Sequence, residues 1–161
     1  MDKPQKAYIS LGSNKGDKFK NLQDAIDDIH LKIGQIKLIS RVYKSPAFGF
    51  EGDEFLNTCL ILETQLPPKK VMQELLSIEK ALGRTRNKKK EYQSRLIDLD
   101  IIFFEDKIIN TKTLKVPHLE MHKRKFVLQP LFDIASKLMH PKRDKEIAVL
   151  LEECEDQTVL E

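Results

Sequence analysis

The chain has 161 residues, of which 40% are hydrophobic and 33% charged, and its formal net charge is +3 at pH 7. This length and composition are typical of one globular domain, spanning 1–161, and exclude a disordered or fibrous chain. No apolar run approaches the roughly 20 residues of a membrane-spanning helix, the N-terminus carries no secretion signal, and two cysteines are too few for a disulfide framework. We therefore expect a monomeric, cytoplasmic protein without a membrane segment.

The first elements in chain order are a strand and a helix. Residues 6–11 alternate weakly between polar and apolar side chains, which predicts a strand, and Gly12, Ser13 and Asn14 are predicted to end it in a turn. From Asp17 onward, apolar residues recur at steps of three and four, which predicts an amphipathic helix ending at Gly34. Its stripe is predicted to be core and consists of Phe19, Leu22, Ile26, Ile29 and Ile33.

The middle of the chain predicts two strands and a second helix. Strand periodicity divides the apolar side chains of residues 35–43 between two faces. One face is predicted to hold Ile36, Leu38 and Val42, and the other Ile39 and Tyr43. Residues 55–64 predict the next strand. The proline pair at 67–68 then opens a helix that stops at residue 83. Its core stripe consists of Val71, Leu75, Ile78 and Leu82.

The last part of the chain predicts a buried strand and short helices. Residues 96–104 form a strongly apolar strand, residues 107–109 a hairpin-like piece, and residues 127–136 and 145–153 two helices. The order βαββαβ with C-terminal helices predicts an α+β fold. We expect a ferredoxin-like two-layer sandwich, an antiparallel sheet with helices on one face.

Charge is unevenly distributed along the chain. Residues 84–95 carry six cations and one acid, whereas residues 152–161 are acidic. A local basic excess indicates a site for a strongly anionic ligand. A solvated basic loop without a ligand would have the same composition, so the loop alone does not decide.

Two carboxylates interrupt the apolar strand 96–104. Because side chains alternate along a strand, Asp98 and Asp100 share one face. Neighbouring carboxylates in apolar surroundings repel each other and lose hydration, unless a cation lies between them. Mg²⁺ suits such a pair, since it binds one or two carboxylates together with substrate phosphates. Salt bridges without a metal are the alternative, and the candidate partners are Arg84, Arg86 and Arg95.

An amide stands among apolar residues in the strand 55–64. Period two puts Phe55, Asn57, Cys59 and Ile61 on one face, so Asn57 is predicted to be buried, where a polar group needs partners. It could satisfy a loop backbone, or it could read the edge of a flat heterocycle with Phe55 against the ring. Cys59 is predicted to be a small core residue rather than a nucleophile.

Common site motifs of other kinds are absent from the sequence. Residues 12–18 lack the spacing of a P-loop, and the histidines and cysteines lack zinc-site spacing. We predict that His30, His122 and His140 lie at the surface, and the pattern around His118 is by itself that of a turn cap. An RNA-binding sheet would need exposed aromatic residues in place of Asp98 and Asp100. A metal-dependent nuclease would use the two carboxylates but leaves the strand with Asn57 unexplained.

Several short motifs occur together and in order. They read ISLGSN at 9–14, YKSP at 43–46, FLN at 55–57, IE at 78–79, GRTR at 83–86, RLIDLDI at 95–101 and VPH at 116–118, followed by Arg124 and Phe126. Over nearly the whole chain, this set resembles the 6-hydroxymethyl-7,8-dihydropterin pyrophosphokinases, a family of the folate pathway. The resemblance implies the ferredoxin-like fold, two Mg²⁺ ions, and transfer of pyrophosphate from ATP to the pterin hydroxymethyl group with release of AMP. It implies small-molecule substrates and no nucleic acid.

The resemblance also implies roles for individual residues. Asp98 and Asp100 would hold both metal ions, and with Arg84 and Arg95 they would form the catalytic set. The ATP-binding residues would be Glu79, Arg84, Arg95, Ile101, His118 and Arg124. Phe55 and Phe126 would sandwich the pterin, and its other contacts would be Ser45, Pro46, Phe48, Asn57 and Asp98. Relative to a familiar form of the family, the loop from Arg86 to Arg95 is one residue longer, Tyr92 replaces a tryptophan and Leu119 a tyrosine. Which of Lys88, Lys89 and Lys90 contact phosphate stays open.

Overall fold

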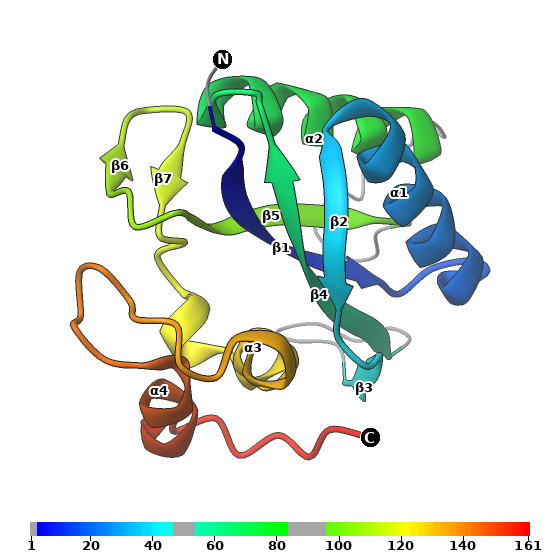
Figure 1. Ribbon diagram of the computed structural model, residues 1–161. Helices are drawn as coiled ribbons and strands as arrows, with labels where there is room; N and C mark the ends of the chain where they lie inside the picture. Colours follow the sequence, from blue (N-terminus) through cyan, green and yellow to red (C-terminus); the bar gives the residue numbers. More distant parts are fainter. Residues whose placement is uncertain (1–2, 47–53, 84–95) are drawn as a thin grey trace.

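The computed structural model describes residues 3–46, 54–83 and 96–161 (Figure 1). Its main sheet has the strand order β2-β4-β1-β5, with β3 paired to β4, and every pair is antiparallel. The strands are β1 (Gln5–Ser13), β2 (Gly34–Ile39), β3 (Tyr43–Ser45), β4 (Phe55–Thr64) and β5 (Asp98–Phe104), with β6 (Ile109–Asn110) and β7 (Lys115–Val116) forming a separate hairpin. The helices are α1 (Lys18–Lys32), α2 (Pro68–Leu82), α3 (Lys125–Ala135) and α4 (Ile147–Glu153), with a 3-10 turn at Met121–Lys123.

The predicted ferredoxin-like core is confirmed, and helices cover parts of both sheet faces (Figure 1). α1 and α2 pack on one face over a cluster that includes Ile9 and Leu62. α3 and α4 lie on the other face over a second cluster that includes Cys59 and Phe103. The second layer of helices forms because β4 and β5 are apolar on both sides, and both sides must be removed from water.

The predicted helices are observed with small shifts at their ends. Asp17 caps α1, its Oδ1 accepting a hydrogen bond from the Lys20 backbone N–H at 3.2 Å. Pro68 opens α2 as predicted. The stripe residues of both helices are buried or packed against the core, except Phe19, which is 64% exposed. The prediction for Phe19 was wrong because periodicity identifies a helix face but not how far the core extends along it.

β2 departs from the predicted alternation. Ile36 lies opposite Leu62 of β4, whereas Leu38 lies opposite Ile61. Because Leu62 and Ile61 are consecutive, Ile36 and Leu38 lie on opposite faces, and the prediction that they share one is wrong. The cause is the register shift between them, since one extra residue in a strand reverses the face of every side chain that follows.

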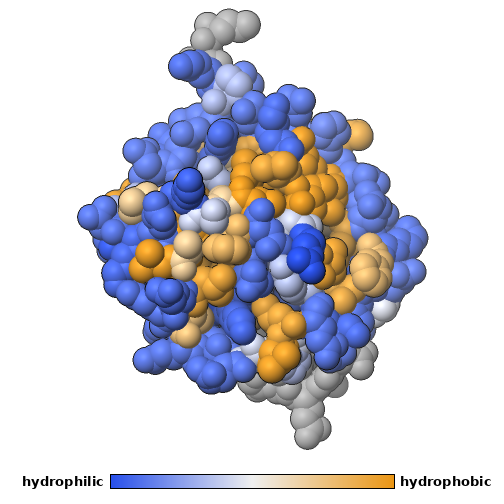
Figure 2. Space-filling view, turned by 60° about the horizontal axis from the view of Figure 1, so that its bottom comes forward, coloured by the Kyte–Doolittle hydropathy of each residue, from blue (hydrophilic) through white to orange (hydrophobic). Residues whose placement is uncertain are grey.

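The surface around α3 and α4 is mixed in polarity. Figure 2, seen from the end of the molecule that carries these helices, shows apolar areas set among hydrophilic residues. Exposed large apolar side chains include Leu38, Ile39, Val42 and Phe132. Within the described ranges, no helix is both long and apolar enough to cross a bilayer. The expected monomer stays a prediction.

Candidate active site

One row of paired residues crosses the sheet and joins its polar side chains. Asn57 of β4 lies opposite Gly12 of β1, and Gly12 lies opposite Asp98 of β5. Two positions along β1, Ser10 lies opposite Asp100. Directly opposed residues share a face, so Asn57, Asp98 and Asp100 all face the side on which α3 packs. Two strand spacings separate Asn57 from Asp98, which is roughly 10 Å.

Asn57 is buried, as predicted, and its amide is held in place. Its side chain is 4% exposed, and its Nδ2 donates to Oγ of Ser45 at 2.8 Å. This bond joins β4 to β3 through side chains as well as through the ladder. An amide oriented in this way can present a donor and an acceptor side by side.

Gly12 keeps the space beside this amide open. A Cβ at this position would lie 3.3 Å from Oδ1 of Asn57 and 3.6 Å from Cδ1 of Phe55. Gly12 belongs to β1, so the predicted turn at residues 12–14 is wrong at its first two positions. A glycine inside a strand often marks a close approach of the backbone, and this signal could have identified Gly12 as a site residue.

Asp98 and Asp100 are half-buried on β5 and share a face, as predicted. Among the residues described, no group of three or more histidine, cysteine, aspartate or glutamate side chains could hold a metal ion. Two carboxylates are nevertheless the usual protein share of a Mg²⁺ site completed by substrate phosphates. The donor set therefore fits a metal that arrives with a phosphate ligand and does not fit an all-protein cage.

The edge of β5 is held by Glu79. Its Oε2 accepts a hydrogen bond from the Leu99 backbone N–H at 2.7 Å, and Leu99 stands between Asp98 and Asp100. Ile101, one position beyond Asp100, has its side chain in the first core cluster and is 5% exposed. Any contact of Ile101 with a ligand would therefore come from its backbone.

The start of α3 lies over the same sheet face. The guanidinium carbon of Arg124 lies 5.8 Å from the centre of the Phe126 ring, and Phe126 is half-buried against the second core cluster. Sγ of Cys59, two positions from Asn57, lies 3.8 Å from the carbonyl oxygen of Val127. Cys59 is fully buried and burial raises the pKa of its thiol, so the prediction of a core cysteine is confirmed.

His118 follows β7 and is fixed by two backbone contacts. Its N–H donates to the Ile102 carbonyl at 3.0 Å, and its Nδ1 accepts from the Glu120 N–H at 3.1 Å. Burial and the nearby charge of Arg124 lower the pKa of His118, partly offset by Glu120 and Asp98. At neutral pH the ring is therefore neutral and its Nε2 carries the proton, which makes it a hydrogen-bond donor.

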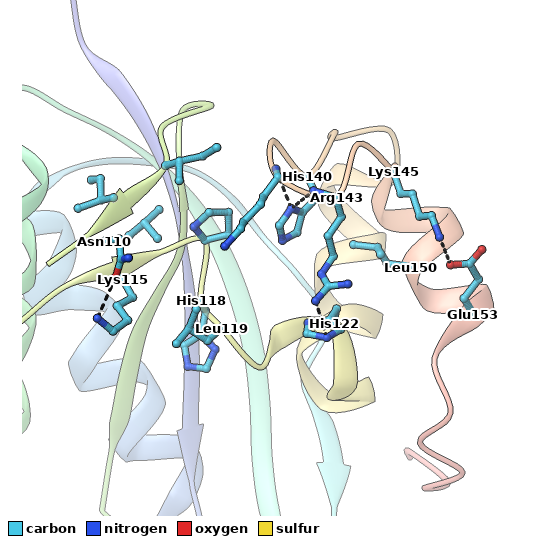
Figure 3. A pocket seen from close by; sticks show the side chains of 15 residues that line it. Asn110, Lys115, His118, Leu119, His122, His140, Arg143, Lys145, Leu150 and Glu153 are labelled. Atoms are coloured by element: carbon cyan, nitrogen blue, oxygen red, sulfur yellow. Dashed lines mark hydrogen bonds and ion pairs between the residues drawn. The ribbon is translucent and has the colours of Figure 1, made fainter. Parts of the chain in front are cut away.

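A cavity of about 710 Å³ lies beside His118 (Figure 3). One side is the β6–β7 hairpin with Lys115, and the other is the loop before α4, which carries Lys142 and Arg143. Arg143 Nη2 lies 2.9 Å from Nε2 of His122. The lining residues contain four lysine or arginine side chains and one carboxylate, that of Glu153, so this side of the molecule favours anions.

His140, which also lines this cavity, is 4% exposed, so its predicted surface position is wrong. Its Nδ1 accepts the backbone N–H groups of Lys142 and Arg143, and its ring packs edge-on against Phe103. The second apolar layer under α3 and α4 buries it. The sequence contains no periodic signal for that layer at this loop.

Several predicted site residues lie outside the described ranges. These are Phe48 and the basic loop with Arg84, Arg86, Lys88, Lys89, Lys90, Tyr92 and Arg95. Pro46 is described and exposed at the end of β3. The structure thus brings Asn57, Ser45, Asp98, Asp100 and the start of α3 to one face, while Glu79 supports β5 from its edge.

Comparison with known proteins gives consistent matches over most of the chain. The family model described as 7,8-dihydro-6-hydroxymethylpterin-pyrophosphokinase (HPPK) matches residues 8–136. A 2-amino-4-hydroxy-6-hydroxymethyldihydropteridine pyrophosphokinase of Aquifex aeolicus is 39% identical over 135 residues, which cover 83% of this chain and 82% of that protein. The protein of the same description from Synechocystis is 38% identical and covers 91% of this chain and 75% of its own length.

Two further matches involve larger proteins. A folic acid synthesis protein of Pneumocystis carinii is 39% identical over 94% of this chain, but the chain spans only 20% of that protein. The wild-type HPPK-DHPS of Plasmodium falciparum, known from a crystal structure, superposes with a TM-score of 0.74 at 15% identity, over 93% of this chain and 41% of that one. The structural likeness shows the fold.

Proposed function

The chain belongs to the 7,8-dihydro-6-hydroxymethylpterin-pyrophosphokinase family, and from this premise we propose that it transfers pyrophosphate from ATP to the hydroxymethyl group of 6-hydroxymethyl-7,8-dihydropterin. The observation that carries the proposal is the row Asn57–Gly12–Asp98, which provides an amide and a carboxylate on one face with no side chain between them. An amide suits the pterin, and a carboxylate suits the metal–phosphate group that reacts with it.

The pterin lies at the Asn57 end of this row. Asn57 offers its amide to the hydrogen-bonding edge of the ring, and Ser45 fixes the amide by accepting from its Nδ2. Phe55 and Phe126 provide the faces against which a flat bicycle stacks. The burial of Asn57 supports this role, because a dry amide discriminates strongly between ligands that pair with it and ligands that do not.

The phosphates lie at the Asp98 end. Asp98 and Asp100 hold two Mg²⁺ ions, which when bound neutralise the phosphate oxygens and bring the pterin hydroxyl to the phosphorus. His118 donates from its neutral Nε2 and Arg124 supplies positive charge. Glu79 lies by the nucleotide, and Ile101 contacts it through backbone. Arg84 and Arg95 complete the catalytic set in the part of the sequence that the structure does not describe.

Transfer of pyrophosphate with release of AMP fixes the bonds that change. The pterin hydroxyl oxygen bonds to the β-phosphorus of ATP, the bond from that phosphorus to the oxygen shared with the α-phosphate breaks, and the hydroxyl proton leaves. A loose phosphoryl-transfer transition state needs alignment and charge more than a strong base. Asn57 and the aromatic rings provide alignment at one end, and the carboxylates, His118 and Arg124 organise charge at the other.

An activity assay tests the proposal directly. The protein is incubated with Mg²⁺, ATP and 6-hydroxymethyl-7,8-dihydropterin, and AMP is quantified. We expect AMP only when the pterin is present. Asp100→Asn should lower kcat/KM at least about 100-fold, because it removes charge at the reacting phosphates. Asp106→Asn, which changes an exposed acid just beyond the same strand, is the matched control and should keep full activity. Near-normal activity of Asp100→Asn would refute the metal assignment.

The pterin assignment has a separate test. Asn57→Ala should raise the KM for the pterin by one to two orders of magnitude, since it removes buried hydrogen bonds, and should leave the KM for ATP nearly unchanged. An equal loss of affinity for both substrates would contradict the placement of the pterin at Asn57.

A further inference from the structure

Residues 154–161 lie outside the part of the chain that matches the family model, yet they pack against the proposed site. Residues 154, 156, 158 and 160 are half-buried, whereas residues 155, 157, 159 and 161 are exposed. This period of two describes an extended segment with one side laid on the protein. The segment runs from the end of α4 past α3 towards β3 (Figure 1).

The first attachment of this segment is to the start of α3. The N-cap residue of α3, Arg124, makes no side-chain capping bond. Instead, Oδ2 of Asp156 accepts a hydrogen bond from the Lys125 backbone N–H at 3.1 Å. The N–H groups of a helix's first turn have no partner within the helix, and a carboxylate is a favourable one because the helix dipole is positive there.

Asp156 is itself oriented by its neighbours. Its Oδ1 accepts from the N–H and the hydroxyl of Thr158, and Nζ of Lys125 donates to the Thr158 carbonyl at 3.1 Å. Burial opposes the ionisation of Asp156, but its hydrogen bonds with Thr158 and Lys125 outweigh this and lower its pKa. The carboxylate is therefore charged at neutral pH. It acts as a helix cap supplied from 31 residues away in sequence.

The second attachment is to β3. The Glu161 N–H donates to the Lys44 carbonyl at 3.2 Å, and its carboxylate lies 3.8 Å from Nζ of Lys44. Lys44 precedes Ser45, the residue that holds the Asn57 amide. The ion pair is exposed and contributes little by itself, whereas the backbone hydrogen bond fixes the path of the segment.

We propose that residues 154–161 are a positioning element for the pterin end of the active site, with Asp156 as the main positioning residue. The inference rests on the proposed function, since it concerns residues assigned to the pterin there. Lys125, which Asp156 caps, stands between Arg124 and Phe126. The segment thus fixes the start of α3 relative to β3, and with it the Phe126 ring relative to the Asn57 amide.

The consequence is specific to one substrate. Loss of the cap lets the first turn of α3 fray, so Phe126 samples more positions and stacks less well on the pterin. Asp98, Asp100 and His118 stand on β5 and after β7, elements that the segment does not touch through any bond described above. The affinity for the pterin should therefore fall more than the affinity for ATP.

The test compares two neighbouring acids. Asp156→Ala should raise the KM for the pterin about five- to tenfold, the effect of losing one helix cap, and change the KM for ATP less than twofold. Glu155→Ala removes an exposed acid one position away and should match the wild type. Asp156→Asn keeps an acceptor for the Lys125 N–H and should fall between the two. Amide exchange should be faster at residues 125–128 in Asp156→Ala and unchanged in α1 and α2.

Two results overturn the inference. One is an Asp156→Ala variant with the same pterin KM as Glu155→Ala, and the other is a variant whose two KM values rise in the same ratio. Failure of the proposed function is distinguishable, because it would appear as a wild-type protein that forms no AMP from ATP and the pterin. With an active wild type, these outcomes bear on the positioning element alone.

Discussion

Gly12 stands in the narrowest part of the row that joins the amide to the first carboxylate. Asn57 lies opposite it on one side and Asp98 on the other. Any larger residue would place its side chain on the face where the proposed reaction occurs. Most strand glycines weaken a sheet because they contribute no side chain to pack, and at Gly12 the missing side chain leaves room for a ligand.

Gly12→Ala tests this interpretation. The added Cβ would lie 3.3 Å from Oδ1 of Asn57, closer than ordinary van der Waals contact, so the amide must turn or move by a few tenths of an ångström. We expect the KM for the pterin to rise about tenfold while the free energy of unfolding changes by less than about 1 kcal/mol. Steady-state kinetics and urea denaturation measure the two quantities.

A double-mutant cycle provides the control. In the Asn57→Ala background the amide is absent, so Gly12→Ala should have a much smaller effect on the pterin KM. Additive effects of the two changes would show that Gly12 does not act through Asn57.

At the scale of single residues, the sequence predicts chemistry better than environment. The pairing of Asp98 with Asp100 and the burial of Asn57 follow from a period of two in strands without Gly or Pro, and both are confirmed. His140 was misplaced because its burial depends on Phe103 and the α3–α4 layer, which are distant in sequence. Gly12 was taken for a turn because glycine signals both turns and close backbone approach.

At the scale of elements, β5 depends on a helix for its free edge. Its inner side pairs with β1, while the outward N–H of Leu99 is bonded by the Glu79 carboxylate of α2 at 2.7 Å. Leu99 is 5% exposed, so water does not readily replace that acceptor. Glu79 thereby positions the two aspartates that flank Leu99, in addition to any contact with nucleotide.

Glu79→Ala should therefore affect both stability and chemistry. Loss of a charged acceptor for a buried N–H is expected to lower the free energy of unfolding by about 2 kcal/mol, and kcat should fall with it because Asp98 and Asp100 shift. Glu79→Gln retains an oxygen acceptor and should recover a large part of both. Glu74→Ala, which breaks only the 3.7 Å pair with Lys70 on the same helix, is the control. If Glu79→Ala raises only the KM for ATP, the residue acts solely on the nucleotide.

The elements themselves were largely predictable, whereas register was not. The bounds of β4 are those predicted, and α1 and α2 shift by one or two residues. The register shift in β2 is invisible in the sequence, since nothing in residues 36–38 favours an extra residue there, and it arises from pairing with β4. Pairing partners across the sheet, which assemble the site, depend on such registers and so had to come from the structure.

At the scale of the whole molecule, the two apolar faces of the sheet link stability to pH. The face under α3 and α4 buries His140 against Phe103, with ring centres 5.4 Å apart. Its Nδ1 is occupied by two backbone N–H groups and cannot take a proton without losing them. Burial, with the nearby charges of Arg143, His122 and Lys142, lowers the pKa of His140 to about 4.

The sign of the pH dependence follows from this shift. In the unfolded chain His140 takes up a proton near its ordinary pKa of 6.5, whereas in the folded protein it does so only near 4. Its contribution is therefore fully present above pH 6.5 and is lost as the pH falls through this window, by on the order of 3 kcal/mol at the lower end. Urea denaturation of the wild type and His140→Gln between pH 7.5 and 4 should give a flatter profile for the variant. His30→Gln, at an exposed position, should run parallel to the wild type. Parallel profiles for all three proteins would show that His140 is not the group whose protonation opens the second layer.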